Sequence, residues 1–291
     1  MLKRINWTRV FYLFAWLISL GGLVVLMSFI GVKKNEAKCN DIKVIIPGIE
    51  SFIDRDEVDA IITKTAGALI GRNLNAVDIH KLENALKANP YIQSAKVYAD
   101  MNGVITVYVE QREPVLRILN VAGMDFYVDR AGLKMPVSAN FTPHVLVANG
   151  FILEGFTGKV DTLQTRLAKG LYQTALFIKK DTLWNDQMEQ LFVNDYREIE
   201  LVPRVGNHKI VLGSADSLET KFKNLLVFYK KAMPHVGWNA YKTINIKYTN
   251  QIVCVKSGVD SALVVRAPQA QKPAADTVDI INQDTLTTAT H

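Results

Sequence analysis

Several residue types are scarce in this chain, and their scarcity excludes whole classes of protein. Only two of the 291 residues are cysteines, so a small domain held together by disulfides is excluded. A bond between Cys39 and Cys254 would require an oxidising compartment and Cα atoms within about 7 Å, and two reduced cysteines are the simpler interpretation. Hydrophobic residues make up 49% of the chain and charged residues 21%, which excludes an intrinsically disordered protein.

Patterns that signal catalysis or metal binding are also missing. The five histidines are scattered, without the His-x-x-x-His spacing that binds zinc on a helix. The sequence contains no Gly-x-Ser-x-Gly elbow, Ser-x-x-Lys pair or phosphate-binding glycine loop. Asp125 and Asp129 are candidates for paired carboxylates, but the string from Asp129 to Gly132 has the composition of a turn. The sequence therefore favours a protein that is not an enzyme and has no cofactor or metal.

The positive charge is concentrated at the beginning of the chain. The formal net charge is +6, and the first 38 residues hold six basic residues against one acidic residue. Between Arg9 and Lys33 lie 23 uncharged residues, and a helix of that length crosses a hydrocarbon core of about 30 Å. The sequence predicts a transmembrane helix over residues 10–32, after a cytoplasmic N-terminus at 1–9 and before a juxtamembrane linker at 33–42. The alternative, a cleavable signal peptide, needs a shorter apolar run and small residues at the cleavage site.

The distribution of the charge bears on the orientation of the chain in the membrane, and it does not indicate a binding surface on the body of the protein. Three basic residues on each side of the apolar run nearly balance the positive-inside rule, and the N-terminal amine favours a cytoplasmic N-terminus. Residues 267–291 are rich in Ala, Gln, Asp, Thr and Pro, with one apolar cluster and no periodicity, which predicts a disordered tail. The body between these ends is close to neutral, so it does not indicate binding to nucleic acid.

Residues 43–113 have the pattern of a small α/β domain. Asp54 is the expected cap of a first amphipathic helix, and Asn75 and Asp78 are the expected caps of a second. Asn102-Gly103 is expected to supply the positive φ angles of a tight hairpin turn. The expected strands lie at 43–46, 95–99 and 104–109. The predicted order is β-α-α-β-β.

The end of this module resembles a known family. The string Asn-Pro-Tyr-Ile-Gln-Ser-Ala-Lys-Val at 89–97, with Val-Glu-Gln-Arg-Glu-Pro at 109–114, resembles the POTRA module of the bacterial cell-division proteins FtsQ and DivIB. Phe-Tyr-Val-Asp at 126–129, followed by Gly132, is similar to an aromatic-Val-Asp-x-x-Gly segment of that family. The resemblance covers most of residues 1–256 and implies that residues 43–113 form a POTRA domain.

The pattern of residues 114–266 predicts a second, β-rich domain. The resemblance implies that this is the FtsQ-type β domain. Short strands alternate with helices, which predicts a mixed or antiparallel sheet with flanking helices and an α+β chain. Lys221, Lys223, Lys230 and Lys231 are expected to contact solvent. The expected strands are 115–119, 126–128, 144–147, 198–202, 209–212, 242–248 and 251–256, and the expected helices are 161–179, a short one with Trp184, Met188 and Leu191, and one from Ser214 or Ser217 to 231.

The final hairpin of this domain carries the candidate partner site. The edge of a sheet exposes backbone groups, so it must be covered, charged or used. In the FtsQ family the corresponding strand is extended by a strand of FtsB, which is β-augmentation. By this resemblance Tyr248 ends the penultimate strand, Asn250 and Gln251 form the turn, and the docking edge comprises Ile252, Val253, Cys254, Val255 and Lys256. The alternative is an edge covered by residues 262–265 or by the tail.

The resemblance implies a non-catalytic scaffold of the divisome. Such a protein is a single-pass protein of the bacterial inner membrane, has periplasmic C-terminal domains, and works at the division septum. It links early cytoplasmic division proteins to an FtsB/FtsL-type complex and to septal peptidoglycan synthesis. One alternative, a POTRA-bearing envelope assembly protein, is disfavoured because no second copy of the POTRA pattern and no barrel-length series of strands follows. The other is a membrane-tethered cell-wall enzyme, which peptidoglycan turnover by the purified ectodomain would reveal.

Overall fold

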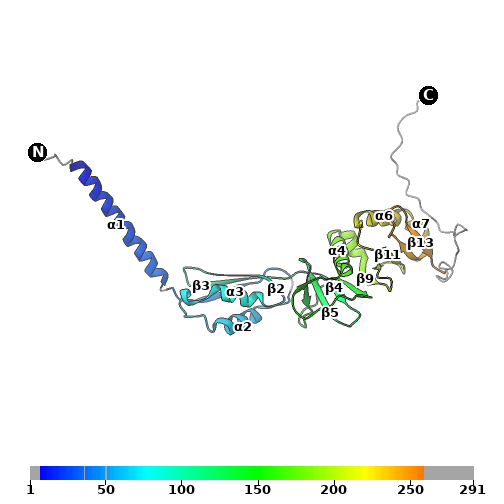
Figure 1. Cartoon of the computed structure of the whole chain (residues 1–291), viewed down its shortest axis with the longest axis horizontal. Coiled ribbons are helices and arrows are strands. Elements are labelled where there is room, and N and C mark those ends of the chain that lie inside the picture. The colour runs from blue at the N-terminus through cyan, green and yellow to red at the C-terminus, as the bar shows by residue number, and fades with distance from the viewer. Residues whose placement is uncertain (1–6, 36, 50, 259–291) are drawn as a thin grey trace, which may run out of the picture. The chain divides into compact units, whose positions relative to one another are not determined.

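The chain folds into two compact units, which divide between Gln111 and Arg112. The structure is a computed structural model that describes residues 7–35, 37–49 and 51–258, and in the first helix it describes the side chains of residues 11–27. Each unit has its own sheet and its own hydrophobic core. Figure 1 shows the elements in chain order, coloured from blue to orange over the described residues.

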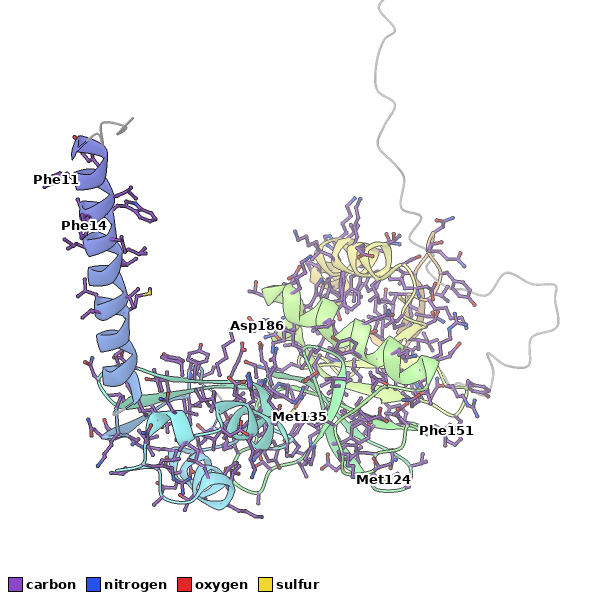
Figure 2. All side chains as sticks on the ribbon, turned by 60° about the vertical axis from the view of Figure 1, so that its left-hand side comes forward. Phe11, Phe14, Met124, Met135, Phe151 and Asp186 are labelled. Carbon is purple, nitrogen blue, oxygen red and sulfur yellow. The ribbon has the colours of Figure 1, made fainter. Side chains whose placement is uncertain are left out.

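Helix α1 (Trp7–Asn35) is the longest helix of the described residues, at 29 residues. The exposed fraction is 72% for Phe11 and 64% for Phe14. Figure 2 shows both side chains projecting from the helix. Among the described residues, no helix combines the length and the apolar character needed to cross a membrane.

The rest of the first unit follows the predicted β-α-α-β-β order. The central strand β3 pairs in parallel with β1 and antiparallel with β2. Both helices bury side chains in one core with this sheet, in which Val58, Leu86 and Val107 are fully buried. The elements are β1 (Asp41–Ile45), α2 (Arg55–Ala66), the 3-10 helix η1 (Leu74–Ala76), α3 (Ile79–Lys87), β2 (Ile92–Ala99) and β3 (Val104–Gln111).

Side-chain caps fix where these two helices begin. The carboxylate of Asp54 accepts a hydrogen bond from the backbone N–H of Glu57 at 2.8 Å, and that of Asp78 accepts one from Lys81 at 3.0 Å. Each cap satisfies an N–H group that the first helical turn leaves without a partner inside the helix. Asn75, the other candidate for the second cap, lies in η1 instead. The capping signals in the sequence therefore located both helix starts.

The hairpin between β2 and β3 turns over residues 101–103 as expected, but only one of the two expected positive φ angles is present. Within this turn Gly103 has a positive φ, +87°, and Asn102 does not. The backbone N–H of Asp100 donates to the carbonyl of Val104 at 2.8 Å, which closes a loop longer than two residues. A Cβ atom at position 103 would lie 2.4 Å from the carbonyl oxygen of Lys38. Glycine is needed here for its φ angle and for this close approach.

The second unit contains a ten-stranded mixed sheet in the order β13-β12-β11-β10-β9-β7-β4-β5-β6-β8. The pairs β4 with β7, β7 with β9, and β11 with β12 are parallel, and the others are antiparallel. The chain is therefore α+β. The strands are β4 (Pro114–Leu119), β5 (Asp125–Asp129), β6 (Leu133–Pro136), β7 (Leu146–Gly150), β8 (Asp161–Thr162), β9 (Met188–Val193), β10 (Ile199–Pro203), β11 (Lys209–Gly213), β12 (Tyr241–Asn245) and β13 (Val253–Lys256).

Helices α4 and α6 cover this sheet and lie on the same side of it in Figure 1. Leu171 and Ile178 of α4 are buried in the core together with Phe222 and Leu225 of α6. Trp184 contacts Phe222 edge to face, with ring centroids 5.0 Å apart. The helices of this unit are α4 (Arg166–Lys180), α5 (Thr182–Gln187), α6 (Leu218–Lys231) and α7 (Met233–Val236).

Two expectations for the helices of this unit were wrong. Met188 and Leu191 lie in β9 and not in a helix, although their spacing from Trp184 is helical. The reason is that β9 is paired on both sides, with β7 and β10, and this pairing determines its conformation. The helix expected from residue 161 begins at Arg166, where the Thr165 hydroxyl caps it, and residues 161–162 pair with β6 instead.

Candidate functional site

The candidate partner edge lies at one end of the ten-stranded sheet. β13 pairs with β12, with Val253 opposite Asn245 and Cys254 opposite Ile244. Among the described residues, no strand lies on the other side of β13. The side chains of β13 are partly exposed, and that of Lys256 is exposed. An edge strand of this kind is where another chain can add a strand.

Half of the predicted site residues lie outside this strand. Residues 246–252 form a longer connection between β12 and β13 than the turn that was expected. Tyr248 does not end the penultimate strand, because β12 ends at Asn245 and Tyr248 lies inside the connection with 46% exposure. Asn250 lies in a turn, and Gln251 follows it. Ile252 is 4% exposed and belongs to the core, so it is not part of the edge.

Hydrogen bonds hold the connection against β11, α6 and the turn between β9 and β10. The backbone N–H of Ile246 donates to a carbonyl of β11 at 2.9 Å. The Asn224 side chain of α6 donates to the carbonyl of Thr249 at 2.7 Å. The ammonium group of Lys247 lies 2.9 Å from the carboxylate of Glu198, and this hydrogen bond raises the pKa of Lys247. Tyr248 is therefore presented by an anchored segment.

A groove of about 820 Å³ opens beside Tyr248. No pattern in the sequence predicted this groove. Strands β7, β9, β11 and β12 all run in one direction, and the groove lies at their carboxyl ends, where ligands bind in many α/β sheets. Its walls include Phe151 and Leu153 after β7, the start of α4, the turn from β9 to β10, and Lys247 with Tyr248.

The groove combines apolar side chains with two arginines. Phe151 is 36% exposed and Leu153 is 52% exposed, and Figure 2 labels Phe151 near the edge of the second unit. Arg166 is exposed at the first turn of α4. The guanidinium of Arg197 lies 5.7 Å from the centre of the Phe151 ring. Arg197 has a φ of +61°, an unusual conformation for a residue other than glycine and one often found at functional positions.

The acidic residues of the groove wall already have cationic partners. Glu198 pairs with Lys247, and Asp216 lies 3.6 Å from the ammonium group of Lys221. Lys221 was expected in solvent, but it is 1% exposed and donates hydrogen bonds to the carbonyls of Leu212 and Ser214. In the part of the chain that the structure describes, no ion pair involves Arg166 or Arg197. The groove is therefore apolar with a local positive charge.

The remaining polar candidates have structural partners. Asp129 is 1% exposed, lies 2.7 Å from the guanidinium of Arg112, and also accepts hydrogen bonds from the turn that follows β5. Asp125 pairs with Arg117. The described residues contain no group of three or more histidine, cysteine, aspartate or glutamate side chains placed to hold a metal ion. Asp125 and Asp129 therefore each belong to an ion pair with a different arginine.

Two family profiles match the chain, one for each unit. Residues 37–110 match the profile described as POTRA-like domain, and residues 113–255 match the one described as FtsQ/DivIB, C-terminal related. A comparison with curated proteins gave no match. The second profile begins with β4 and ends within β13, so it covers the whole ten-stranded sheet apart from its last residue. The chain belongs to the FtsQ/DivIB family.

Proposed function

We propose that this protein is a non-catalytic scaffold of the bacterial divisome that captures a partner of the FtsB/FtsL type at β13. Membership of a cell-division family supports the general role. The observation that carries the specific proposal is the position of β13 at the end of the sheet, because an added strand would extend the sheet without rearranging it. The docking strand comprises Val253, Cys254, Val255 and Lys256, and Tyr248 flanks it.

The proposed scaffold is anchored in the inner membrane by residues 10–32. The support is the run of 23 uncharged residues between basic flanks in the sequence. The POTRA domain at 43–113 and the β domain at 114–266 then lie in the periplasm, at the septum. In this arrangement the protein joins early cytoplasmic division proteins to septal peptidoglycan synthesis.

Co-purification with the full chain tests the proposal. Cys254→Pro and Lys256→Pro each remove a backbone N–H that points away from β12, because Val253 and Val255 lie opposite Asn245 and Thr243, which face β13. A proline whose N–H side faces outward is tolerated in an edge strand. We expect these variants to lose the FtsB/FtsL-type partner while circular dichroism shows that they stay folded. Thr162→Pro in β8, at the opposite edge of the same sheet, is the matched control and keeps the partner.

Undiminished partner recovery with both folded β13 variants would refute capture at this edge. A fluorescent fusion that fails to localise to midcell would refute the role in division itself. Peptidoglycan turnover by the purified protein would instead support a cell-wall enzyme.

A further inference from the structure

The groove beside Tyr248 takes no part in strand addition at β13, and its side chains favour a different ligand. Its exposed aromatic and aliphatic side chains favour a ligand that buries apolar groups. Its two arginines, which form no ion pair among the described residues, favour a ligand with carboxylates next to those apolar groups. Such a ligand is an acidic, apolar peptide segment.

The chain itself contains a segment of this kind. Residues 276–286 read Asp-Thr-Val-Asp-Ile-Ile-Asn-Gln-Asp-Thr-Leu, with three aspartates, four aliphatic residues and no basic residue. We propose that the groove binds residues 276–286 of the same chain, with the aliphatic side chains against Phe151, Leu153 and Tyr248 and the aspartates facing Arg166 and Arg197.

The length of the connecting chain permits this contact. The described part of the second unit ends at Gly258, just after β13, so 17 residues separate it from Asp276. β13 runs antiparallel to β12, and its end therefore lies about one strand length, roughly 15 Å, from the carboxyl end of β12 at the groove. Seventeen residues can span at most about 55–60 Å. The length of the chain therefore permits the segment to reach the groove.

The covalent connection also lowers the affinity that is needed. A short flexible linker gives a tethered segment an effective concentration on the order of 1 mM. A segment that binds the isolated groove with a dissociation constant of about 0.1 mM would therefore occupy its own groove for about 90% of the time. The modest contact area of four aliphatic side chains and three carboxylates is sufficient. The proposal is independent of partner capture at β13.

Photo-crosslinking in the purified full chain tests the proposal. A benzophenone amino acid replaces Leu153, which is half exposed on the groove wall, and mass spectrometry identifies the crosslinked peptide. We expect the crosslink to map to residues 276–286 within one molecule. Arg197→Glu weakens the contact about fivefold, which is the effect of one surface charge pair. The occupancy then falls from about 90% to about 67%, and the crosslink yield falls by about a quarter. Lys169→Glu, which changes an exposed charge on α4 away from the groove wall, leaves the yield unchanged.

A charge exchange distinguishes direct contact from a general effect on folding. Changing Asp276, Asp279 and Asp284 to lysine lowers the yield, and adding Arg166→Glu with Arg197→Glu restores it. Crosslinks that map elsewhere, or a yield that ignores these changes, would overturn the proposal. Crosslinked dimers whose yield rises with protein concentration would overturn it as well, because the groove would then hold the tail of a second copy.

Discussion

Lys134 and Glu154 form an ion pair that is almost completely removed from solvent. The ammonium group lies 3.0 Å from the carboxylate, and the side chains are 4% and 0% exposed. Glu154 also accepts hydrogen bonds from the backbone N–H groups of Gln164 at 2.9 Å and Thr165 at 2.8 Å. Burial raises the pKa of Glu154, but these hydrogen bonds and the lysine outweigh burial, so the pKa is lowered overall. The pair joins β6 to the segment after β7, and the two hydrogen bonds join that segment to the start of α4.

Removing the lysine should leave a buried carboxylate without its charge partner. We expect Lys134→Met to lower the free energy of unfolding by about 3–5 kcal/mol. Lys247→Met removes the cation of a pair whose side chains are 35% and 30% exposed and should cost about 0–1 kcal/mol. Urea unfolding measures both values. Equal losses for the two variants would show that burial does not determine the contribution of these pairs.

His208 should make the stability of the second unit depend on pH. Its Nε2 atom lies 3.0 Å from the hydroxyl of Tyr229, and burial lowers the pKa of His208. Because the folded state binds the proton less well than the unfolded chain, stability should fall as the pH drops below about 6.5. We expect His208→Asn to lose less stability than the wild type between pH 7 and pH 5. His144→Asn, at an exposed position, should follow the wild type.

At the scale of single residues, contacts with nearby residues could be predicted from the sequence, and contacts with other elements could not. Asp54 and Asp78 could be predicted as caps because a cap bonds to N–H groups a few residues away. Lys221 could not be predicted as buried, because the carbonyls that bind its ammonium group lie in and just after β11, on another element. The arginines of the groove were missed for the same reason, since α4 and the turn after β9 meet only in the folded sheet.

At the scale of elements, the helices could be predicted from their own residues, but the strands that depend on their neighbours could not. The helical stripes of α4 and α6 follow from their own periodicity and are confirmed. The residues of β9 were predicted to be helical, because the spacing of their apolar side chains fits both a helix and a strand. Pairing with β7 and β10 determines that they form a strand. The connection at 246–252 was predicted too short. The groups that hydrogen-bond to it lie on β11 and α6, and no pattern in the residues of the connection itself indicates these hydrogen bonds.

The contact between β7 and β9 should depend on Gly150. Gly150 has a φ of +96°, and a Cβ atom there would lie 2.2 Å from the carbonyl oxygen of Val193. Gly158 has a φ of +81° and would have no atom within 4 Å of an added Cβ. We expect Gly158→Ala to cost about 1–2 kcal/mol, the cost of a left-handed alanine. Gly150→Ala should cost clearly more in the same thermal unfolding assay, and equal costs would mean that the strands separate easily.

At the scale of the whole molecule, two separate cores predict two separate responses to mutation. Leu86 is buried in the core of the first unit, and Leu171 is buried in that of the second. We expect Leu86→Ala, which removes about 2–5 kcal/mol of packing, to speed amide hydrogen exchange in residues 51–111 and not in the second unit. Leu171→Ala should do the reverse. Faster exchange in both units after either substitution would contradict their independence.

The family could be predicted from the sequence because its signals are local strings, at 89–97, 109–114 and 126–129. The order of the ten strands could not, because it depends on pairings between residues far apart in the chain. The predicted docking edge keeps four of its residues, Val253, Cys254, Val255 and Lys256, in a terminal strand. Its capture of a partner stays a prediction.

Amide hydrogen exchange with the periplasmic segment of an FtsB/FtsL-type partner tests this central claim most directly. Strand addition places new hydrogen bonds along β13, so exchange at residues 253–256 should slow when the segment is added. Exchange at β8, the opposite edge of the same sheet, should stay unchanged. Unchanged exchange at β13 under conditions where the partner binds would contradict the account, because the partner would then be held elsewhere on the molecule.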